Sequence, residues 1–397
     1  MLNGKNIILG VTGSIAAYKI ANLASALVKL GASVDVIMTP NATQFITPVT
    51  FETLTSHKCI VDTFDRNFDF SVEHVSLAKK ADVVLIAPAS ADIIGKMAAG
   101  ICDNMLLTTV FATKAPVIIS PAMNTGMFTN PILQDNINKL KGYGYHFIEP
   151  ASGRLACGDT GTGKMPEPEV LLEYIIEYAT KNDSFNGKKV LITAGPTREA
   201  IDPVRYITNH STGKMGYAIA KAAYLSGADV TIVSGPVEIK PFHGVNVIPV
   251  KSANDMFNAV KDNYKGFDII IMSAAVADYT PTTYVDSKIK KSDGDMRIEL
   301  SRTTDILKFV GENKGENQLL IGFSMETDNL IENSAKKLKS KNADMICANS
   351  LNGNKTGFGT DTNLVTVITK NKTEELPFGT KEEVAFEILK QIKELSK

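Results

Sequence analysis

Residues 5–38, KNIILGVTGSIAAYKIANLASALVKLGASVDVIM, decide the fold of this 397-residue chain. An apolar run over 5–11 ends in a glycine turn, an amphipathic segment follows from Ser14 to Leu30, and a second apolar run covers 34–38. Short apolar runs are typical of buried strands, whereas the segment between them has the period of a helix. The stretch therefore predicts a strand–helix–strand unit whose parallel strands bind ligands at their carboxyl ends.

The same pattern begins again near the middle of the chain. Residues 189–233 predict a second strand–helix–strand unit, and the polar stretch 181–187 separates the two halves. Because the chain is too long for one ordinary core, we expect an α/β protein of two doubly wound domains. The first, over 1–182, is expected to be flavodoxin-like, and the second, over 187–397, Rossmann-like. The other apolar runs and amphipathic segments predict strands at about 83–87, 117–120, 145–148, 245–250, 268–272, 318–323, 344–348 and 364–369, and helices at about 168–179, 253–263, 304–312, 329–341 and 381–395.

The composition excludes several classes of protein. There are 42 Lys and Arg against 43 Asp and Glu, a net charge of -1, so nothing favours nucleic acid or a membrane surface as a partner. No apolar stretch approaches the length of a membrane span. The four cysteines are far apart and form no CxxC pair, which argues against a zinc site and a disulfide framework. We expect a soluble cytoplasmic protein.

Two helix starts in the first half predict a phosphate site. The segment 10–19 lacks the G-x-G-x-x-G spacing, so it is not a dinucleotide fingerprint. Ser14 nevertheless stands at a helix start, where free N–H groups attract a phosphate, although a plain helix cap explains this segment equally well. Ser90 occupies the same place after a later strand, in 87–92. Two such ends at one sheet edge predict a bound mononucleotide.

Two loops carry side chains that a fold does not need. Residues 121–128, PAMNTGMF, place the carboxamide of Asn124 in a turn, and residues 153–158, GRLACG, place the thiol of Cys157 in a glycine-rich flap. Each loop alone could be ordinary surface. Together, after a flavodoxin-like start, they favour an active site.

The flap also contains a misleading match. Residues 158–164, GDTGTGK, have the spacing of a phosphate-binding P-loop, but Met165 stands where Ser or Thr must bind magnesium. Pro166 follows at once, and no apolar strand precedes the loop. A flap that closes over a substrate fits better.

The second half has its own polar loops at strand ends. The loop 193–216, which contains Asn209, offers hydroxyl and N–H groups to a phosphate, although a plain Rossmann-like loop is equally compatible. Asp278 follows a buried strand, which is a ligand position in this architecture. Lys337 and Lys341 are four residues apart and share a helix face, as a phosphate clamp or a solvated flank would require.

Several of these motifs resemble a known family. The first half is similar to the homo-oligomeric flavin-containing cysteine decarboxylases through GSIAAYK at 13–19, His74-Val75-Ser76, PAMNTGMF and the flap with Cys157. The whole chain resembles the bifunctional phosphopantothenoylcysteine decarboxylase / phosphopantothenate–cysteine ligases of coenzyme A biosynthesis. The motifs match in order across nearly the full length.

The resemblance implies roles for residues of the first half. Asn124 would bind the substrate carboxylate, His74 would act in oxidative decarboxylation, and Cys157 would donate the final proton. A lone histidine would otherwise be taken as a surface residue. Lys164 departs from the family, in which arginine is common, and keeps a cation without bidentate geometry. The implied FMN contacts are Gly13, Ser14, Thr39 and Ser90.

The resemblance also implies roles in the second half. Lys288, in a short cationic run that would otherwise be a solvated loop, would support formation of an acyl-cytidylate, and Asn209 would act in its conversion to product. Mg2+ is expected with CTP, without assigned ligands. The implied CTP contacts are Asp278, Phe323, Lys337 and Lys341.

The chemistry explains these cofactors. Loss of CO2 from a cysteine carboxylate needs an electron sink, and an amine already bound as an amide cannot form a Schiff base. Oxidation of the thiol by a flavin creates that sink. A carboxylate reacts with an amine only after activation, which a nucleoside triphosphate with Mg2+ provides. The implied substrates are 4'-phosphopantothenate, L-cysteine and CTP, and the implied assembly is a homo-oligomer with trimeric decarboxylase and dimeric ligase contacts.

Two other interpretations remain. One is a flavoprotein that decarboxylates a peptidyl cysteine, joined to a nicotinamide-dependent domain; the missing G-x-G-x-x-G in both halves argues against it. The other is a flavin-binding regulatory subunit without catalysis. It would not need His74, Asn124 and Cys157 together.

Overall fold

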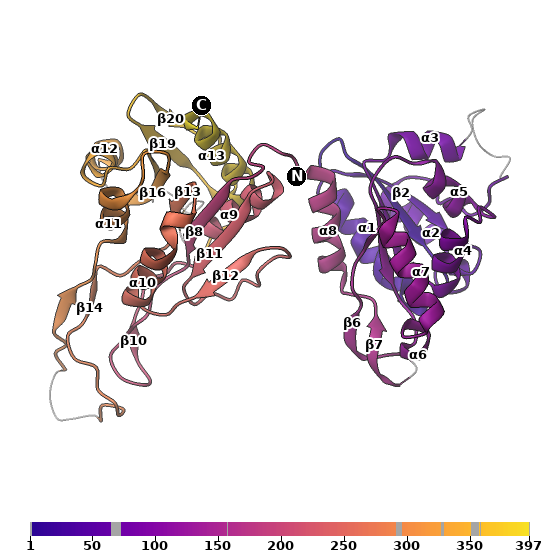
Figure 1. The fold of residues 1–397 in the computed structure, drawn as a ribbon, viewed down its shortest axis with the longest axis horizontal. Helices are drawn as coiled ribbons and strands as arrows, with labels where there is room; N and C mark the ends of the chain where they lie inside the picture. Colours follow the sequence, from indigo (N-terminus) through magenta and orange to yellow (C-terminus); the bar gives the residue numbers. More distant parts are fainter. Residues whose placement is uncertain are drawn as a thin grey trace. The chain divides into compact units, whose positions relative to one another are not determined.

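The protein consists of two compact units, Met1–Thr180 and Lys181–Lys397, each built around its own sheet (Figure 1). The computed structural model describes residues 2–64, 73–156, 158–290, 296–326, 329–350, 357 and 359–396. In the described part of the chain, no helix is long and apolar enough to cross a membrane.

The first unit contains a five-stranded parallel sheet with the order β2-β1-β3-β4-β5. This is the flavodoxin-like order, in which the chain reverses direction across the sheet between β1 and β3. Nearly every residue of β1 and β3 is buried, because parallel strands are covered on both faces. The strands are β1 (Asn6–Val11), β2 (Ser33–Met38), β3 (Val83–Ala89), β4 (Val117–Pro121) and β5 (His146–Phe147).

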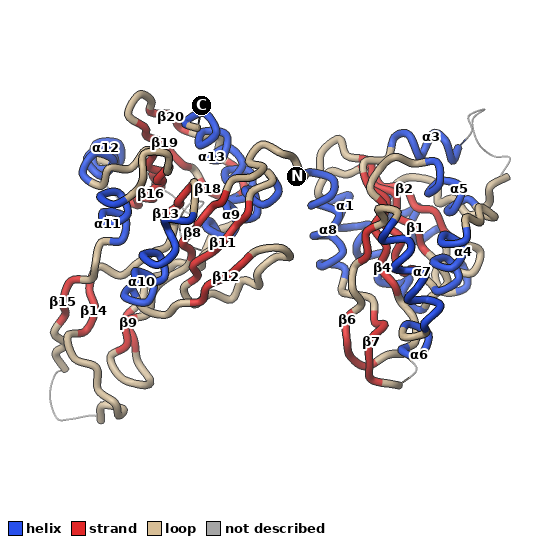
Figure 2. The backbone as a smooth tube through the Cα atoms, in the orientation of Figure 1, coloured by secondary structure: helices blue, strands red, loops and turns tan. Residues whose placement is uncertain are grey.

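Helices cover both faces of this sheet (Figure 2). On one side α1 packs against α2 and α8, and on the other α3 packs against α5 and α4 against α7. A glycine-rich hairpin, β6 (Ala151–Arg154) with β7 (Thr160–Lys164), extends from the unit. The helices are α1 (Tyr18–Lys29), α2 (Pro48–Thr55), α3 (Glu73–Lys80), α4 (Ala91–Ala99), α5 (Met105–Ala112), α6 (Thr125–Phe128), α7 (Pro131–Gly142) and α8 (Pro168–Thr180).

The second unit contains an eight-stranded sheet with the order β12-β11-β8-β13-β16-β17-β19-β20. The strands from β12 to β17 are parallel in the Rossmann order, and two antiparallel strands extend the far edge. The strands are β8 (Lys189–Ala194), β11 (Asp229–Ser234), β12 (Asn246–Pro249), β13 (Ile269–Met272), β16 (Leu319–Glu326), β17 (Met345–Ser350), β19 (Val365–Thr369) and β20 (Thr373–Glu375).

The isoleucine run of β13 shows how the two faces of this sheet are filled. Ile269 and Ile271 contact the core beneath α9 and α13, whereas Ile270 contacts the core beneath α10, α11 and α12. Side chains of a strand alternate between faces, so a continuous apolar run serves both cores. Each fully buried isoleucine contributes about 1.5–3 kcal/mol. The helices are α9 (Lys214–Leu225), α10 (Ala253–Asn263), α11 (Ile306–Asn313), α12 (Leu330–Ser340) and α13 (Lys381–Leu395).

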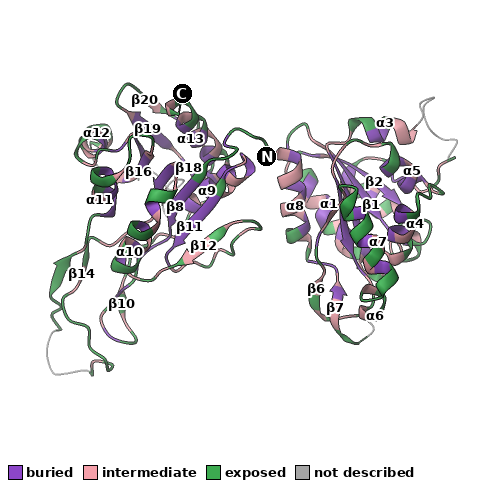
Figure 3. Cartoon of the chain, viewed as in Figure 1, coloured by how far each residue is buried: buried purple, intermediate pink, exposed green. Residues whose placement is uncertain are grey.

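Two exposed ribbons project from this second core (Figure 3). They are β9 (Glu199–Ala200) with β10 (Tyr206–Ile207), and β14 (Tyr279–Pro281) with β15 (Leu300–Arg302). The short pair β18 (Thr362–Asn363) and β21 (Gly379–Thr380) lies before α13. The doubly wound α/β fold predicted for both halves is confirmed.

Candidate functional sites

The first unit holds a cavity of about 850 Å³ beside the carboxyl ends of β1, β3 and β4. Four residues predicted to bind flavin or substrate line it: Gly13, Ser14, Ser90 and Asn124. Ser14 caps the short 3-10 helix before α1, with its hydroxyl accepting a hydrogen bond from Ala16 N, and Ser90 caps α4 in the same way. Two positive helix starts therefore meet at one cavity.

A buried threonine joins the two loops that carry these serines. Thr12 Oγ1 donates to Pro88 O at 2.6 Å and accepts from Ser90 N at 2.9 Å. Its hydroxyl thus fixes the distance between Ser14 and Ser90, which stand at the two helix starts. Sequence reasoning missed Thr12, since a threonine in a glycine turn carries no sign of a partner 76 residues away.

Asn124 connects the PAMNTGMF motif to the flap. It caps α6, where its Oδ1 accepts from Gly126 N at 2.7 Å, and its Nδ2 donates to Asp159 Oδ2 at 3.3 Å. Next to it, Met123 N donates to Gly163 O at 3.1 Å. The flap is therefore hydrogen-bonded to the motif on which the predicted substrate carboxylate would lie. The P-loop match is excluded, since its last five residues form strand β7.

At the wall of this cavity, two lysines pair with the carboxylate of Glu167. Lys19 Nζ lies 2.8 Å from both carboxylate oxygens of Glu167, and Lys164 Nζ lies 3.4 Å from Glu167 Oε1. The hydrogen bonds from Lys19 lower the pKa of Glu167, and Lys164 adds to the effect. The flap and the start of α1 are thus joined through one carboxylate.

The other predicted residues of the first unit lie elsewhere. Thr39 is buried and does not line the cavity, and its hydroxyl has no hydrogen-bond partner among the described residues. His74 stands in the first turn of α3 and does not line the cavity. Cys157 lies outside the described residues.

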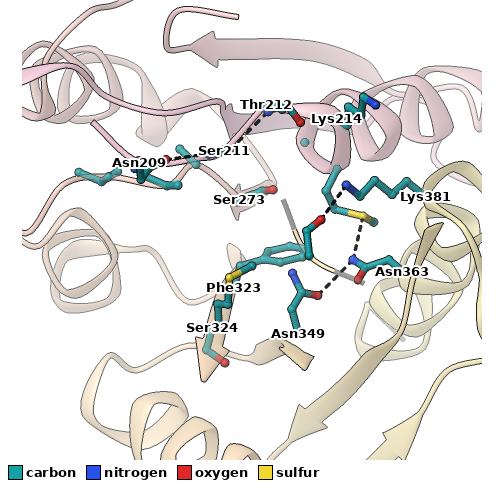
Figure 4. A pocket seen from close by; sticks show the side chains of 18 of the residues that line it. Asn209, Ser211, Thr212, Lys214, Ser273, Phe323, Ser324, Asn349, Asn363 and Lys381 are labelled. Carbon is teal, nitrogen blue, oxygen red and sulfur yellow. Dashed lines mark hydrogen bonds between the residues drawn. The ribbon is translucent and has the colours of Figure 1, made fainter. Parts of the chain in front are cut away.

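Two cavities of the second unit, of about 400 and 470 Å³, share a wall. Three of the predicted CTP contacts form this wall: Asp278, Phe323 and Lys337. Figure 4 shows the smaller cavity, with Asn209, Ser211 and Thr212 along one side and Phe323 opposite. Both cavities lie beside the carboxyl ends of parallel strands, where the fold predicts ligands.

Asn209 ties two loops of the smaller cavity together. Its Nδ2 donates to Ala275 O at 2.6 Å, and its Oδ1 accepts from Ser211 N at 3.1 Å (Figure 4). The loop before α9 is therefore fixed to the loop after β13. This leaves the backbone of Ser211 to Gly213 along the cavity wall, close to the positive end of α9.

The two lysines of the predicted clamp differ in their surroundings. Lys337 lines both cavities, and its Nζ donates to Phe323 O at 2.9 Å. Lys341 follows the last turn of α12, lines neither cavity, and pairs with Asp305 Oδ2 at 2.5 Å. Burial opposes ionisation of Asp305, but hydrogen bonds, chiefly from Lys341, outweigh it and lower the pKa of that carboxyl. Lys288 is exposed and lines neither cavity.

Comparison with known proteins agrees with this division into two sites. Residues 1–180 match the family model described as Flavoprotein, and residues 185–395 match the model described as DNA/pantothenate metabolism flavoprotein C-terminal domain. The chain is 49% identical to the coenzyme A biosynthesis bifunctional protein CoaBC of Bacillus subtilis, over 100% of this chain and 98% of the relative. The chain belongs to the family of coenzyme A biosynthesis bifunctional proteins.

Other members and relatives of the family are similar over most of their length. CoaBC of Borreliella burgdorferi is 44% identical over 98% of this chain and 99% of its own. A protein described as cysteine/cysteine sulfinic acid decarboxylase, from an unknown prokaryotic organism, is 47% identical over 87% of this chain and 98% of its own. The resemblance inferred from the sequence motifs is confirmed.

The cavities of this family member also contain lysines that sequence reasoning missed. Lys381 and Lys214 line the smaller cavity at the first positions of α13 and α9 (Figure 4). Lys381 is buried and donates to Thr360 O at 2.6 Å; burial lowers its pKa, and the charge of Lys214 adds to this. The sequence contained a signal for the position of Lys381, since Thr380 and Glu383 form the capping-box pattern that marks the start of a helix.

The larger of these two adjoining cavities has a further wall that was not predicted. Thr303, Thr304 and Asp305 line it at the N-terminal side of α11, opposite Lys337. Within the described residues, no group of three or more His, Cys, Asp or Glu side chains could hold a metal ion. The ligands of Mg2+ therefore stay unassigned.

Proposed function

We propose that the chain catalyses two consecutive steps of coenzyme A biosynthesis. Residues 187–397 join cysteine to 4'-phosphopantothenate with CTP, through an acyl-cytidylate. Residues 1–182 then decarboxylate the resulting phosphopantothenoylcysteine to 4'-phosphopantetheine. The proposal is carried by the presence of two separate sites, each at the strand ends of its own sheet, in a chain 49% identical over its full length to a bifunctional CoaBC protein.

The cavity of the first unit suits FMN. Two helix starts, at Ser14 and Ser90, offer N–H groups to a phosphate, and the buried Thr39 hydroxyl lacks a partner among the described residues. Bound FMN supplies a two-electron acceptor for the substrate thiol. The charged residues of the wall are Lys19, Arg154, Lys164 and Glu167, and the other lining residues are uncharged, which suits an uncharged ring system.

The residues around this cavity would then act on the substrate. Asn124 would bind the carboxylate that is lost, with its Nδ2 turning from Asp159 to the substrate. His74 would act in the oxidative half of the reaction. Cys157 would donate the final proton, so its thiol must be protonated at the working pH.

In the second unit, the loop before α9 would hold the nucleotide phosphates. The backbone of Ser211 to Gly213, the positive end of α9 and Lys337 supply donors and positive charge there. Mg2+ would offset the remaining phosphate charge. Lys288 would support formation of the acyl-cytidylate, and Asn209 its reaction with the amine of cysteine.

We further propose that the chain functions as a homo-oligomer, with trimeric contacts between decarboxylase units and dimeric contacts between ligase units. His74 lines no part of the cavity in its own chain, and Lys288 lines neither cavity of the second unit. Completion of each site by a second copy would explain both positions.

Mass spectrometry of the products tests the proposal. The purified protein is incubated with FMN, 4'-phosphopantothenate, cysteine, CTP and Mg2+, and we expect 4'-phosphopantetheine and CMP. Accumulation of phosphopantothenoylcysteine alone would refute the decarboxylase half, and absence of any condensation product would refute the ligase half. A parallel incubation with free cysteine alone tests the activity named for the relative described as cysteine/cysteine sulfinic acid decarboxylase; cysteamine as the main product would replace the proposed substrate.

Variants of neighbouring lysines locate the nucleotide. Lys337→Met is expected to raise the KM for CTP at least about tenfold, because a charge-assisted contact to phosphate is worth about 1.5–3 kcal/mol. Lys336→Met is the matched control, since Lys336 is exposed on the same helix and pairs only with Glu332, at 2.8 Å, among the ion pairs of the described residues. Equal effects of both variants would place the nucleotide elsewhere.

A further inference from the structure

A carboxylate is buried at the tip of an exposed ribbon in the second unit. Asp202, between β9 and β10, is 2% exposed, whereas Val204 beside it is 58% exposed and Tyr206 46%. Burial of a charge is costly unless hydrogen bonds compensate it. Because the ribbon has so little apolar packing, the burial of this carboxylate must be explained by the groups that contact it.

Five hydrogen bonds compensate the charge of Asp202. Its Oδ1 accepts from the backbone N–H groups of Val204 and Arg205, both at 2.8 Å. Its Oδ2 accepts from Arg205 Nε at 3.0 Å, from Arg205 Nη2 at 2.5 Å and from the backbone N–H of Ile289 at 3.2 Å. Hydrogen bonds from the Arg205 guanidinium hold the pKa of Asp202 well below its usual range, so the group is ionised at any working pH.

Two of these contacts reach a distant segment of the chain. Ile289, 87 residues away, is held on both sides of its backbone, since its N–H donates to Asp202 and its carbonyl accepts from Arg205 Nη2 at 3.0 Å. A third bond joins the same elements, from Val285 N to Ile201 O at 3.3 Å. The ribbon turn therefore fixes the segment 285–289.

Among the described residues, these contacts are the main ones that hold the segment. From Thr282 to Lys290 every residue is exposed except Ile289, which is half-buried. Lys288 directly precedes Ile289, and the N–H that Asp202 binds belongs to the peptide bond between them. The backbone at Lys288 is thus set by Asp202 and not by apolar packing.

We propose that Asp202 is a positioning residue of the ligase reaction, which together with Arg205 holds Lys288 in working geometry through their contacts with the backbone of Ile289. The inference rests on the proposed role of Lys288. Asp202 neutralises Arg205 locally, so the positive charge that this segment offers to a nucleotide comes from Lys288 and Lys290. A displacement of about 1 Å in such a group can cost about 100-fold in rate.

A double-mutant cycle tests the proposal in the full-length protein with the ligation assay. Asp202→Asn keeps the shape but places an NH2 group among the donors of Arg205 and Ile289. It is expected to lower kcat about 10- to 100-fold with the KM for CTP within about threefold. In a Lys288→Met background, Asp202→Asn is expected to lower kcat by less than about a further threefold, because Asp202 acts on the reaction through the side chain of Lys288. A purely structural role would instead give losses that multiply.

The other outcomes are equally decisive. Multiplicative losses, or an Asp202→Asn variant within threefold of the parent, would overturn the inference. A parent protein without ligation would refute the proposed function itself, and a fully active Lys288→Met variant would refute the proposed role of Lys288; both can be told apart from these outcomes. If Asp202→Asn fails to fold, Asp202→Glu, which keeps the charge and shifts it by one methylene, takes its place in the cycle. Asp344→Asn is the matched control: Asp344 accepts from Leu320 N at 2.8 Å, pairs with Lys314, and lines neither cavity, so its loss should leave kcat unchanged.

Discussion

Gly163 is the position in the flap where the smallest possible substitution should do the most damage. Its φ of +121° lies in a region that favours glycine, and a β-carbon there would overlap the carbonyl oxygen of Met123. The Met123 residue belongs to the PAMNTGMF motif and donates its N–H to Gly163 O. Gly163→Ala therefore pushes the flap away from the residue that precedes Asn124.

The magnitude follows from two contributions. Backbone conformations of this kind cost about 1–3 kcal/mol for a residue with a β-carbon, and loss of the 3.1 Å hydrogen bond between Met123 and Gly163 costs about 1 kcal/mol. The docked flap should lose about 2–4 kcal/mol in total. If turnover requires a docked flap, decarboxylation should fall by about 30-fold or more, since about 1.4 kcal/mol corresponds to a factor of ten.

The assay is the formation of 4'-phosphopantetheine from phosphopantothenoylcysteine with saturating FMN. Gly144→Ala is the matched control, because Gly144 has a similar φ of +91° but nothing within 4 Å of its β-carbon position. It should lose stability without losing turnover. Ligation by the same chain is an internal control, since the second unit is compact by itself. Decarboxylation by Gly163→Ala within about threefold of the parent protein would refute the reasoning.

Three further results are expected. Removal of FMN by dialysis should stop decarboxylation and leave ligation unchanged; equal loss of both activities would show that one site serves both. Because Lys19 lowers the pKa of Glu167, their ion pair stabilises the first unit at pH values above the ordinary carboxyl pKa of 4.5, and this stabilisation is lost as pH falls through the lower pKa of the folded state. Lys19→Met should therefore weaken the decrease of the free energy of unfolding at acid pH, measured by urea denaturation. An unchanged decrease would contradict this. Ser334→Ala should lower the stability of the second unit by about 1–3 kcal/mol, because it leaves the buried hydroxyl of Ser324 without the Ser334 hydroxyl that lies 2.7 Å from it. Changing both serines to alanine should recover part of this loss in a thermal melt. No recovery would show that the hydroxyl pair is not the cause.

The regular part of the fold could be predicted because the hydrophobic pattern of each strand–helix–strand unit lies within one short stretch of sequence. The two units that begin at residues 5 and 189 have clear periods and glycine stops. Their strands and helices lie within one residue of the predicted bounds, except that α1 begins at Tyr18, after a 3-10 turn and four residues later than predicted. Four helices of the first unit, α2, α5, α6 and α7, were not predicted. One of them, α5, reads MLLTTVFA, and a short run that is apolar on all sides cannot be told from a strand by its period.

The flap shows a different limit. Its strands contain Gly153, Gly161 and Gly163, residues that weaken a strand in isolation. The hairpin is held by contacts with another part of the chain, such as the hydrogen bond from Thr125 Oγ1 to Thr162 O at 2.8 Å. Local propensity therefore predicted only a loop. Two of these glycines leave room for the PAMNTGMF motif, since a β-carbon would collide with Thr125 at Gly161 and with Met123 at Gly163.

In the candidate sites, residues expected to contact a ligand could be predicted, whereas residues that hold the loops in place could not. Residues expected to meet a ligand stand in recognisable motifs at strand ends. Ser14, Ser90 and Asp278, which line the cavities, were predicted for that reason. Residues that hold the loops act on distant backbone groups: Thr12 reaches 76 residues along the chain, and Asp202 reaches 87. Nothing near either residue in the sequence indicates its partner. Yet removal of one such side chain leaves a buried donor or acceptor unpaired, at about 1–3 kcal/mol, in the loop that sets the geometry of the reaction. A description of either site that stops at the ligand contacts therefore omits the residues that make those contacts possible.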